Sequence, residues 1–356
     1  MQILGGTVRI SSLEALHCAG FPLSEVIEVE AGAPAVDQVL LRRAAVIPQE
    51  VKAIKNKLLV KGGLEVRVAY RSRGVREPVQ VLHTMPISQI IEAPGVTENT
   101  ANTLRLAVNS LDVTPKADGS GAARLLELNA RVGADVRGYA PVELPVVRDA
   151  YSTQGGVALD TRRLETRQLL ESFREPFVAK EAFDLPGGIQ SVLLLGGELL
   201  PPETVVKNDA LLVTGKAKFH VIYLDGEGQI ASADKDLPYA FKKNLKRGDG
   251  TLSADVEVDL LGAQESVSGG ALEIRAELAA LGELFAAQAH NIVGAVTQSE
   301  EEPPRRSPLT IYFAGEGEPL WEIAKRYRTT MDAVRLENEL SGDTVSAGQM
   351  LLIPSV

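Results

Sequence analysis

Histidines, cysteines and clustered carboxylates are the side chains through which this chain could perform acid–base, nucleophilic or metal chemistry. Its four histidines, His17, His83, His220 and His290, are widely separated, and no two have the close spacing at which paired histidines hold a metal ion. Cys18 is the single cysteine, and we expect it to be a small buried apolar residue rather than a nucleophile. These residues therefore predict neither a metal site nor an activated thiol, and no cofactor is expected.

Other motifs that carry chemistry are absent or have a simpler explanation. No glycine-rich loop followed by Lys-Ser or Lys-Thr is present to hold a phosphate, and the Gly-x-Ser-x-Gly motif of hydrolases does not occur. Asp255, Glu257 and Asp259 alternate with valines, so we expect them on the solvated face of a strand rather than around a calcium ion. We therefore expect a protein without catalytic activity.

The charge balance argues against a nucleic-acid partner. The 356 residues include 37 Lys and Arg against 47 Asp and Glu, which gives a formal net charge of −10. The basic runs are short, whereas binding to phosphates needs clustered positive charge. No nucleic-acid partner is therefore expected.

Cysteine use and the N-terminal sequence bear on the compartment. One cysteine cannot form an intramolecular disulfide, which is typical of a reducing environment. No stretch approaches the ~18 consecutive apolar residues of a membrane helix, and Met1–Arg9 lacks the basic start and apolar run of a signal peptide. We therefore expect a cytoplasmic protein with no membrane insertion.

A repeat is visible along the chain. Leu58–Tyr70 returns as Leu211–Tyr223, a shift of 153 residues, and Leu126–Val132 returns as Leu272–Leu278, a shift of 146 residues. The blocks keep their order while the shift shortens, so insertions and deletions lie in the loops. Such self-similarity predicts two copies of one structural unit.

Within these blocks apolar and polar residues alternate, as in an antiparallel strand with one buried and one solvated face. Glycine-rich turns such as Asp118–Gly121 and Asp225–Gly228 separate the blocks. The pattern predicts a mainly β fold with two tandem antiparallel β-rich domains, each a sandwich or a partial barrel. His220 falls at the position of Arg67 on the polar face, so we expect it to be solvated. The residues expected to point inward are Leu64, Val66, Val68 and Tyr70, then Leu126, Leu128, Ala130, Val132 and Ala134 in the first copy, and Ala217, Phe219, Val221 and Tyr223, then Leu272, Ile274, Ala276, Leu278 and Ala280 in the second.

Composition divides the chain into four segments. We expect the first repeat over residues 1–150 and the second over residues 151–298, with a connecting helix near 160–172. Residues 299–308 are rich in acids and prolines and cannot build a core, so they are predicted to be a linker. Residues 309–356 form a small C-terminal module.

The module is predicted to contain a strand, two helices and a second strand. A short strand is expected over 310–314, and Pro319 suits the first helical position, where its missing N–H is not needed. Thr330 can cap a second helix that runs to about Asn338, and a closing strand precedes Pro354. The apolar residues at helical spacing are Leu320, Ile323, Ala324 and Tyr327, followed by Met331 and Val334.

This module resembles the LysM domain, on the strength of Gly317–Tyr327, Asn338 and Gly348–Pro354. LysM domains bind N-acetylglucosamine-containing glycans in a shallow groove between two loops, so the resemblance implies a groove for glycan or partner binding here. The family's Gly-Asp-Thr is Gly317-Glu318-Pro319 in this chain, which removes a hydroxyl and a backbone N–H from one rim. Glycan binding, protein binding and a structural role therefore stay open. The groove residues would be Gly315, Glu316, Gly317, Glu318 and Pro319 on one rim and Val345, Ser346, Ala347, Gly348 and Gln349 on the other.

The repeats, in turn, resemble the SPOCS domain of spore coat-associated proteins. Two such domains ahead of a terminal LysM module are similar to SipL-like spore morphogenetic proteins of endospore-forming Clostridia. The resemblance implies a scaffold or adaptor on the mother-cell side of the forespore surface, docked through its LysM-like module to a coat-basement ATPase. The alternative is a cell-wall-associated protein that binds peptidoglycan.

Overall fold

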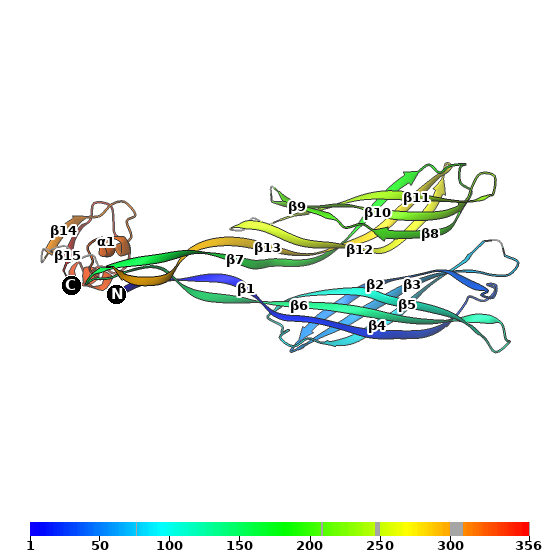
Figure 1. The fold of residues 1–356 in the computed structure, drawn as a ribbon, viewed down its shortest axis with the longest axis horizontal. Coiled ribbons are helices and arrows are strands. Elements are labelled where there is room, and N and C mark those ends of the chain that lie inside the picture. The colour runs from blue at the N-terminus through cyan, green and yellow to red at the C-terminus, as the bar shows by residue number, and fades with distance from the viewer. Residues whose placement is uncertain (76, 208, 246–249, 300–308, 356) are drawn as a thin grey trace. The chain divides into compact units, whose positions relative to one another are not determined.

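The computed structural model describes residues 1–75, 77–207, 209–245, 250–299 and 309–355. Across these ranges the chain forms β-strands, with two short helices near the C-terminus (Figure 1), so the predicted mainly β fold is confirmed. The predicted linker, residues 299–308, lies outside the described residues except for Ser299.

The first repeat is a sandwich of two three-stranded sheets. One sheet has the order β1-β6-β5 and the other the order β2-β3-β4. Strands β2 and β3, β3 and β4, and β5 and β6 pair antiparallel. A single apolar core fills the space between the sheets. The strands are β1 (Gln2–Glu28), β2 (Gln38–Ile54), β3 (Lys57–Arg71), β4 (Val79–Glu92), β5 (Ala101–Ala117) and β6 (Ala123–Tyr151).

The second repeat has the same construction. One sheet has the order β11-β10-β8, with the short β9 also paired to β10, and the other has the order β12-β13-β7. The β10 pairings are antiparallel throughout. The strands are β7 (Gly156–Phe183), β8 (Ser191–Leu199), β9 (Glu203–Lys207), β10 (Ala210–Leu224), β11 (Ile230–Asn244), β12 (Thr251–Ser268) and β13 (Ala271–Ser299).

The alternating residues identified in the sequence form the cores of both sandwiches. Every residue predicted to point inward from β3, β6, β10 and β13 is buried. Tyr70 and Tyr223, 153 residues apart, show the equivalence of the repeats in detail. Each is fully buried and donates its hydroxyl to a proline carbonyl, Tyr70 to Pro34 and Tyr223 to Pro186, both at 2.9 Å. A buried tyrosine hydroxyl needs such a partner.

The connecting helix predicted near 160–172 is wrong, because these residues lie within strand β7. Leu164, Thr166 and Gln168 turn inward at alternate positions, which is the period of a strand. The local order of polar and apolar residues there fits either a helix or a strand. The pairing of β7 with β13 in one sheet favours the strand. The helices α1 (Leu320–Arg326) and α2 (Met331–Glu337) have seven residues each. Across the described residues, no helix is long and apolar enough to cross a membrane.

The chain divides into two compact units that do not follow the repeat boundary. Unit 1 comprises Met1–Ile10, Val142–Arg167 and Ala287–Val356, and unit 2 comprises Ser11–Pro141 and Gln168–Ala286. The long strands β1, β6, β7 and β13 contribute residues to both units. The domain boundaries expected near residues 150 and 298 stay predictions.

Candidate functional site

The C-terminal module has the predicted order of strand, helix, helix and strand. Strand β14 (Leu309–Phe313) pairs antiparallel with β15 (Met350–Pro354), and α1 and α2 lie between them in sequence. The side chain of Thr330 accepts a hydrogen bond from the N–H of Ala333 at 3.0 Å, so the predicted cap of α2 is confirmed. The core of the module is Ala314, Leu320, Ile323, Val334, Val345, Leu351 and Ile353.

Asn338 joins the end of α2 to β15. Its side-chain amide donates to the carbonyl of Leu352 at 2.7 Å, and its side-chain oxygen accepts from the N–H of Leu352 at 2.6 Å. These two bonds satisfy the backbone of a strand that has β14 as its neighbour on the other side. The second helix and the second loop are thus held in fixed positions.

Backbone hydrogen bonds bring the two predicted rims, residues 315–319 and 345–349, together. The N–H of Ala314 donates to the carbonyl of Gln349 at 2.9 Å, and the N–H of Gly348 donates to the carbonyl of Ala314 at 2.8 Å. Gly317 and Gly348 have φ of 66° and 73°, a left-handed conformation in which glycine has no steric penalty. The two loops therefore lie side by side, and a groove for glycan or partner binding between them stays a prediction.

The residues of the two predicted rims differ in how exposed they are to solvent. Gly315, Glu316, Gly317 and Pro319 are exposed on the first rim, and Ser346, Ala347 and Gly348 are exposed on the second. Gln349 is half-buried, and its side-chain oxygen accepts from the N–H of Ser346 at 2.9 Å. Val345 was predicted to lie on the second rim, but it is 8% exposed and its side chain packs in the module core.

The carboxylate of Glu318 is engaged by the module itself. Oε2 accepts from the Tyr312 hydroxyl at 2.6 Å and from the N–H of Gly315 at 3.0 Å, while Oε1 lies 2.9 Å from Arg326. The hydrogen bond from Tyr312, followed by that from Gly315, lowers the pKa of Glu318. The acid at this rim therefore orders the loop instead of offering free acceptors to a ligand.

A second exposed surface lies on the face of the β14–β15 sheet that turns away from the helices. Leu309, Ile311, Phe313 and Met350 are 48%, 60%, 64% and 54% exposed, and we call these four residues the sheet patch. Phe313 and Met350 are directly opposite each other across the two strands. Tyr312 and Leu351, at the intervening positions, turn toward the core. Sequence reasoning missed this patch, although Leu309, Ile311 and Phe313 are large apolar residues at alternate positions of a short strand and could have indicated it.

The face of α1 opposite the module core packs on the end of β6 within unit 1. The Trp321 ring contacts the Tyr151 ring edge-to-face at a centroid distance of 4.8 Å. Trp321 Nε1 and Lys325 Nζ both donate to Asp149 Oδ2, at 2.8 and 2.6 Å, and the Tyr151 hydroxyl donates to the carbonyl of Thr329 at 2.7 Å. The module is thus fixed through α1, while the sheet patch stays exposed.

This packing should depend on pH. Burial by itself raises the pKa of Asp149, but hydrogen bonds from Lys325 and Trp321 leave that pKa below the ordinary 3.8. Ionised Asp149 therefore contributes stability that is fully present above about pH 4 and is lost as pH falls through the lowered pKa. Burial and Asp149 raise the pKa of Tyr151 to about 12, so its contribution persists below about pH 10 and is lost as pH rises through about 12.

Trp321, the single tryptophan of the chain, reports on this contact. We expect its fluorescence emission to stay constant from pH 7 to about pH 4 and to shift to longer wavelength at lower pH. In an Asp149→Asn variant, residue 149 no longer titrates, so the acid shift should be lost or strongly reduced. The same acid shift in both proteins would contradict the role of Asp149.

The residues first considered for catalysis have local partners. Cys18 is exposed, not buried as expected, and a hydrogen bond with Asp135 raises the pKa of its thiol. His220 is exposed as predicted and lies 2.5 Å from Asp234. No group of three or more His, Cys, Asp or Glu in the described part of the chain could hold a metal ion.

The acids on β12 do not share the solvated face predicted for them. Glu257 is exposed and pairs with Arg105 at 2.7 Å, but Asp259 is half-buried and pairs with Arg174 at 3.4 Å. Burial raises the pKa of Asp259. Separate arginine partners hold these carboxylates in different environments.

Comparison with known proteins identifies two domains. A model of the SipL SPOCS domain matches residues 35–116, and a model of the LysM domain matches residues 315–354. No curated protein and no solved structure gives a significant match. In domain content the chain thus combines a SipL-type SPOCS domain, which indicates a sporulation context, with a C-terminal LysM domain, and both are binding or scaffold domains rather than catalytic families.

Proposed function

We propose that this SipL-like chain is a non-catalytic scaffold or adaptor in endospore coat assembly. The SPOCS match supports a role in sporulation. The second repeat, outside that match, has the strand pairings of the first and the same tyrosine–proline hydrogen bond, which supports a second SPOCS-type domain. The site of action is the mother-cell cytoplasm, at the forespore surface.

The LysM module is the docking end, and its partner is the coat-basement ATPase. The sheet patch is the observation that carries this proposal, because three large apolar residues and Met350 are more than two-fifths exposed on one small module. Clustered exposed apolar side chains are typical of protein-binding surfaces. The contact of α1 with β6 leaves this patch accessible and gives it a fixed orientation within unit 1.

Peptidoglycan binding through the groove is the second candidate. The juxtaposed, exposed rims at 315–319 and 346–349 support it. The engaged carboxylate of Glu318 and the missing hydroxyl and N–H at Pro319 weaken it, because glycan recognition depends on placed polar groups.

Two binding measurements on the full chain separate these candidates. We expect the protein to bind the immobilised coat-basement ATPase and to stay in the supernatant when insoluble peptidoglycan is sedimented. The double variant Glu318→Asp, Pro319→Thr restores the Gly-Asp-Thr rim and serves as the matched control for glycan binding. If the natural chain sediments with peptidoglycan as well as this variant and does not bind the ATPase, the wall-binding function replaces the proposed one.

A further inference from the structure

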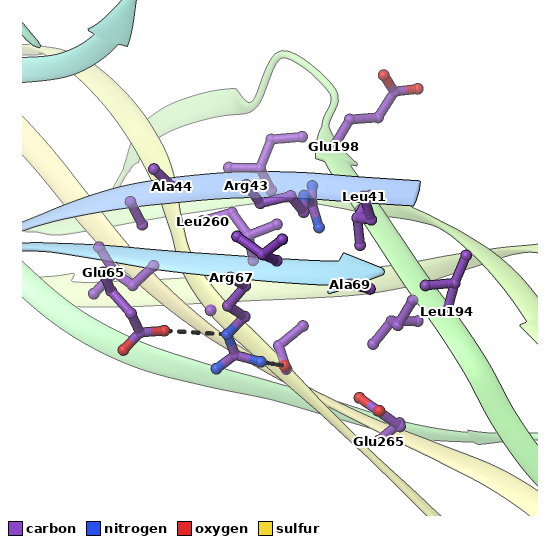
Figure 2. A pocket seen from close by; sticks show the side chains of 18 of the residues that line it. Leu41, Arg43, Ala44, Glu65, Arg67, Ala69, Leu194, Glu198, Leu260 and Glu265 are labelled. Carbon is purple, nitrogen blue, oxygen red and sulfur yellow. Dashed lines mark hydrogen bonds and ion pairs between the residues drawn. The ribbon is translucent and has the colours of Figure 1, made fainter. Parts of the chain in front are cut away.

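A cavity of about 280 Å³ lies within unit 2 and has no role in the proposed function. It is bordered by β2 and β3 of the first repeat and by β8 and β12 of the second (Figure 2). Much of the wall is aliphatic, including Leu41, Leu194, Leu195, Leu199 and Leu260.

Two arginines lie side by side in this wall. Arg43 on β2 and Arg67 on β3 are directly opposite each other in the register of the two strands. Arg67 has partners, since its Nε lies 3.2 Å from Glu65 and its Nη1 donates to the carbonyl of Ala263 at 2.8 Å. Arg67 therefore connects β3 of the first repeat to β12 of the second repeat.

Arg43 lacks such partners. Its half-buried guanidinium makes no hydrogen bond or ion pair with any residue in the described ranges. Figure 2 shows it between Leu41 and Leu260, with the Glu198 carboxylate pointing away from it. A half-buried charge beside a like charge is destabilising unless something compensates it.

The electrostatics of Arg43 agree with this geometry. Burial and the neighbouring charge of Arg67 lower its pKa, and Glu198 offsets only part of this effect. A guanidinium stays protonated at neutral pH nonetheless. The guanidinium of Arg43 is therefore charged at neutral pH, and a bound anion would stabilise it.

We propose that this cavity binds a small monoanionic organic acid, with its carboxylate on Arg43 and its apolar body against the leucines. A planar guanidinium matches a carboxylate in geometry, and the aliphatic wall suits a short hydrocarbon body. Four acids, Glu65, Glu198, Asp259 and Glu265, also border the cavity and would repel a second negative charge. This excludes doubly charged ligands such as phosphate monoesters.

Octanoate has the required size, charge and apolar body, and octanol is its neutral counterpart. Titration calorimetry on the full chain should detect octanoate binding at a stoichiometry of one, with octanol at least tenfold weaker. An Arg43→Gln variant should lose octanoate binding by tenfold or more. Arg42→Gln removes the same charge from the neighbouring, exposed position on β2, which pairs with Asp112, and should bind as the natural chain does.

Thermal unfolding separates loss of binding from loss of fold. Without ligand, Arg43→Gln should unfold at the same temperature as the natural chain or a higher one, because the cross-strand repulsion is removed. Octanoate should raise the unfolding temperature of the natural chain and not that of the variant. N-acetyl-leucine distinguishes a peptide carboxyl terminus from a free fatty acid as the source of the carboxylate, according to which probe binds more tightly. Equal octanoate binding to Arg43→Gln, or no octanoate and no N-acetyl-leucine binding to the natural chain, overturns the proposal.

Discussion

Replacing Phe313 with aspartate is expected to weaken binding of the coat-basement ATPase about 100-fold or more. Phe313 is the most exposed residue of the sheet patch, at 64%, and faces Met350 across the two strands. Large apolar anchors at the centre of an interface carry much of its binding energy, and a buried, unpaired carboxylate adds a desolvation cost. A factor of 100 corresponds to about 2.8 kcal/mol, which one such residue can supply.

The fold should not change, because the side chain contributes little to the module core, which lies on the other face of β14. Biolayer interferometry on the full chain measures the affinity, and circular dichroism checks the fold. Leu336→Asp is the matched control, since Leu336 on α2 is 83% exposed in the same module but lies outside the patch. If both variants bind the ATPase as the natural chain does, the patch is not the docking surface.

Features that depend on neighbouring residues could be predicted from the sequence. The alternation in β3 and β10 identifies which side chains are buried, because a strand places every second residue on the same face. The cap at Thr330 is equally local, since its oxygen reaches an N–H three residues away. The two loops at 315–319 and 345–349 are assigned through the resemblance to the LysM domain, and their role as groove rims stays a prediction.

Features that depend on long-range packing could not be predicted. Asp149 and Trp321 are 172 residues apart, and neither residue by itself indicates a hydrogen bond between them. The same holds for residues 160–172, whose local pattern allows a helix until pairing with β13 is known. The arginine pair in the cavity requires the register of β2 on β3, and the wall opposite comes from the second repeat.

A buried carboxylate on β13 provides the second large effect. Glu283 is 5% exposed and accepts hydrogen bonds from the hydroxyls of Thr103, at 2.6 Å, and Tyr139, at 2.9 Å. Arg137 lies 3.3 Å from the same carboxylate. These partners are on β5 and β6, so within unit 2 this one side chain joins strands of the first repeat to a strand of the second. Burial and the hydrogen bond to Glu283 raise the pKa of Tyr139, which keeps its hydroxyl a donor.

Replacing Glu283 with alanine should lower the free energy of unfolding of unit 2 by about 3 kcal/mol. Removing one member of a buried charged network leaves the others without partners, at a typical cost of about 3–5 kcal/mol. The half-exposed Arg137 can recover water, which places the expected value at the lower end. Glu257→Ala is the matched control, because its exposed pair with Arg105 also joins β12 to β5 but should contribute less than about 1 kcal/mol.

Urea unfolding followed by far-ultraviolet circular dichroism measures the difference, since Trp321 lies in unit 1 and its fluorescence does not report on this network. If the two alanine variants lose similar stability, Glu283 acts as an ordinary surface carboxylate. If Glu283→Ala alone is strongly destabilised, the repeats depend on each other for stability. The walls of the cavity beside Arg43 come from both repeats, so the shape of this cavity would then depend on the contacts that Glu283 makes between them.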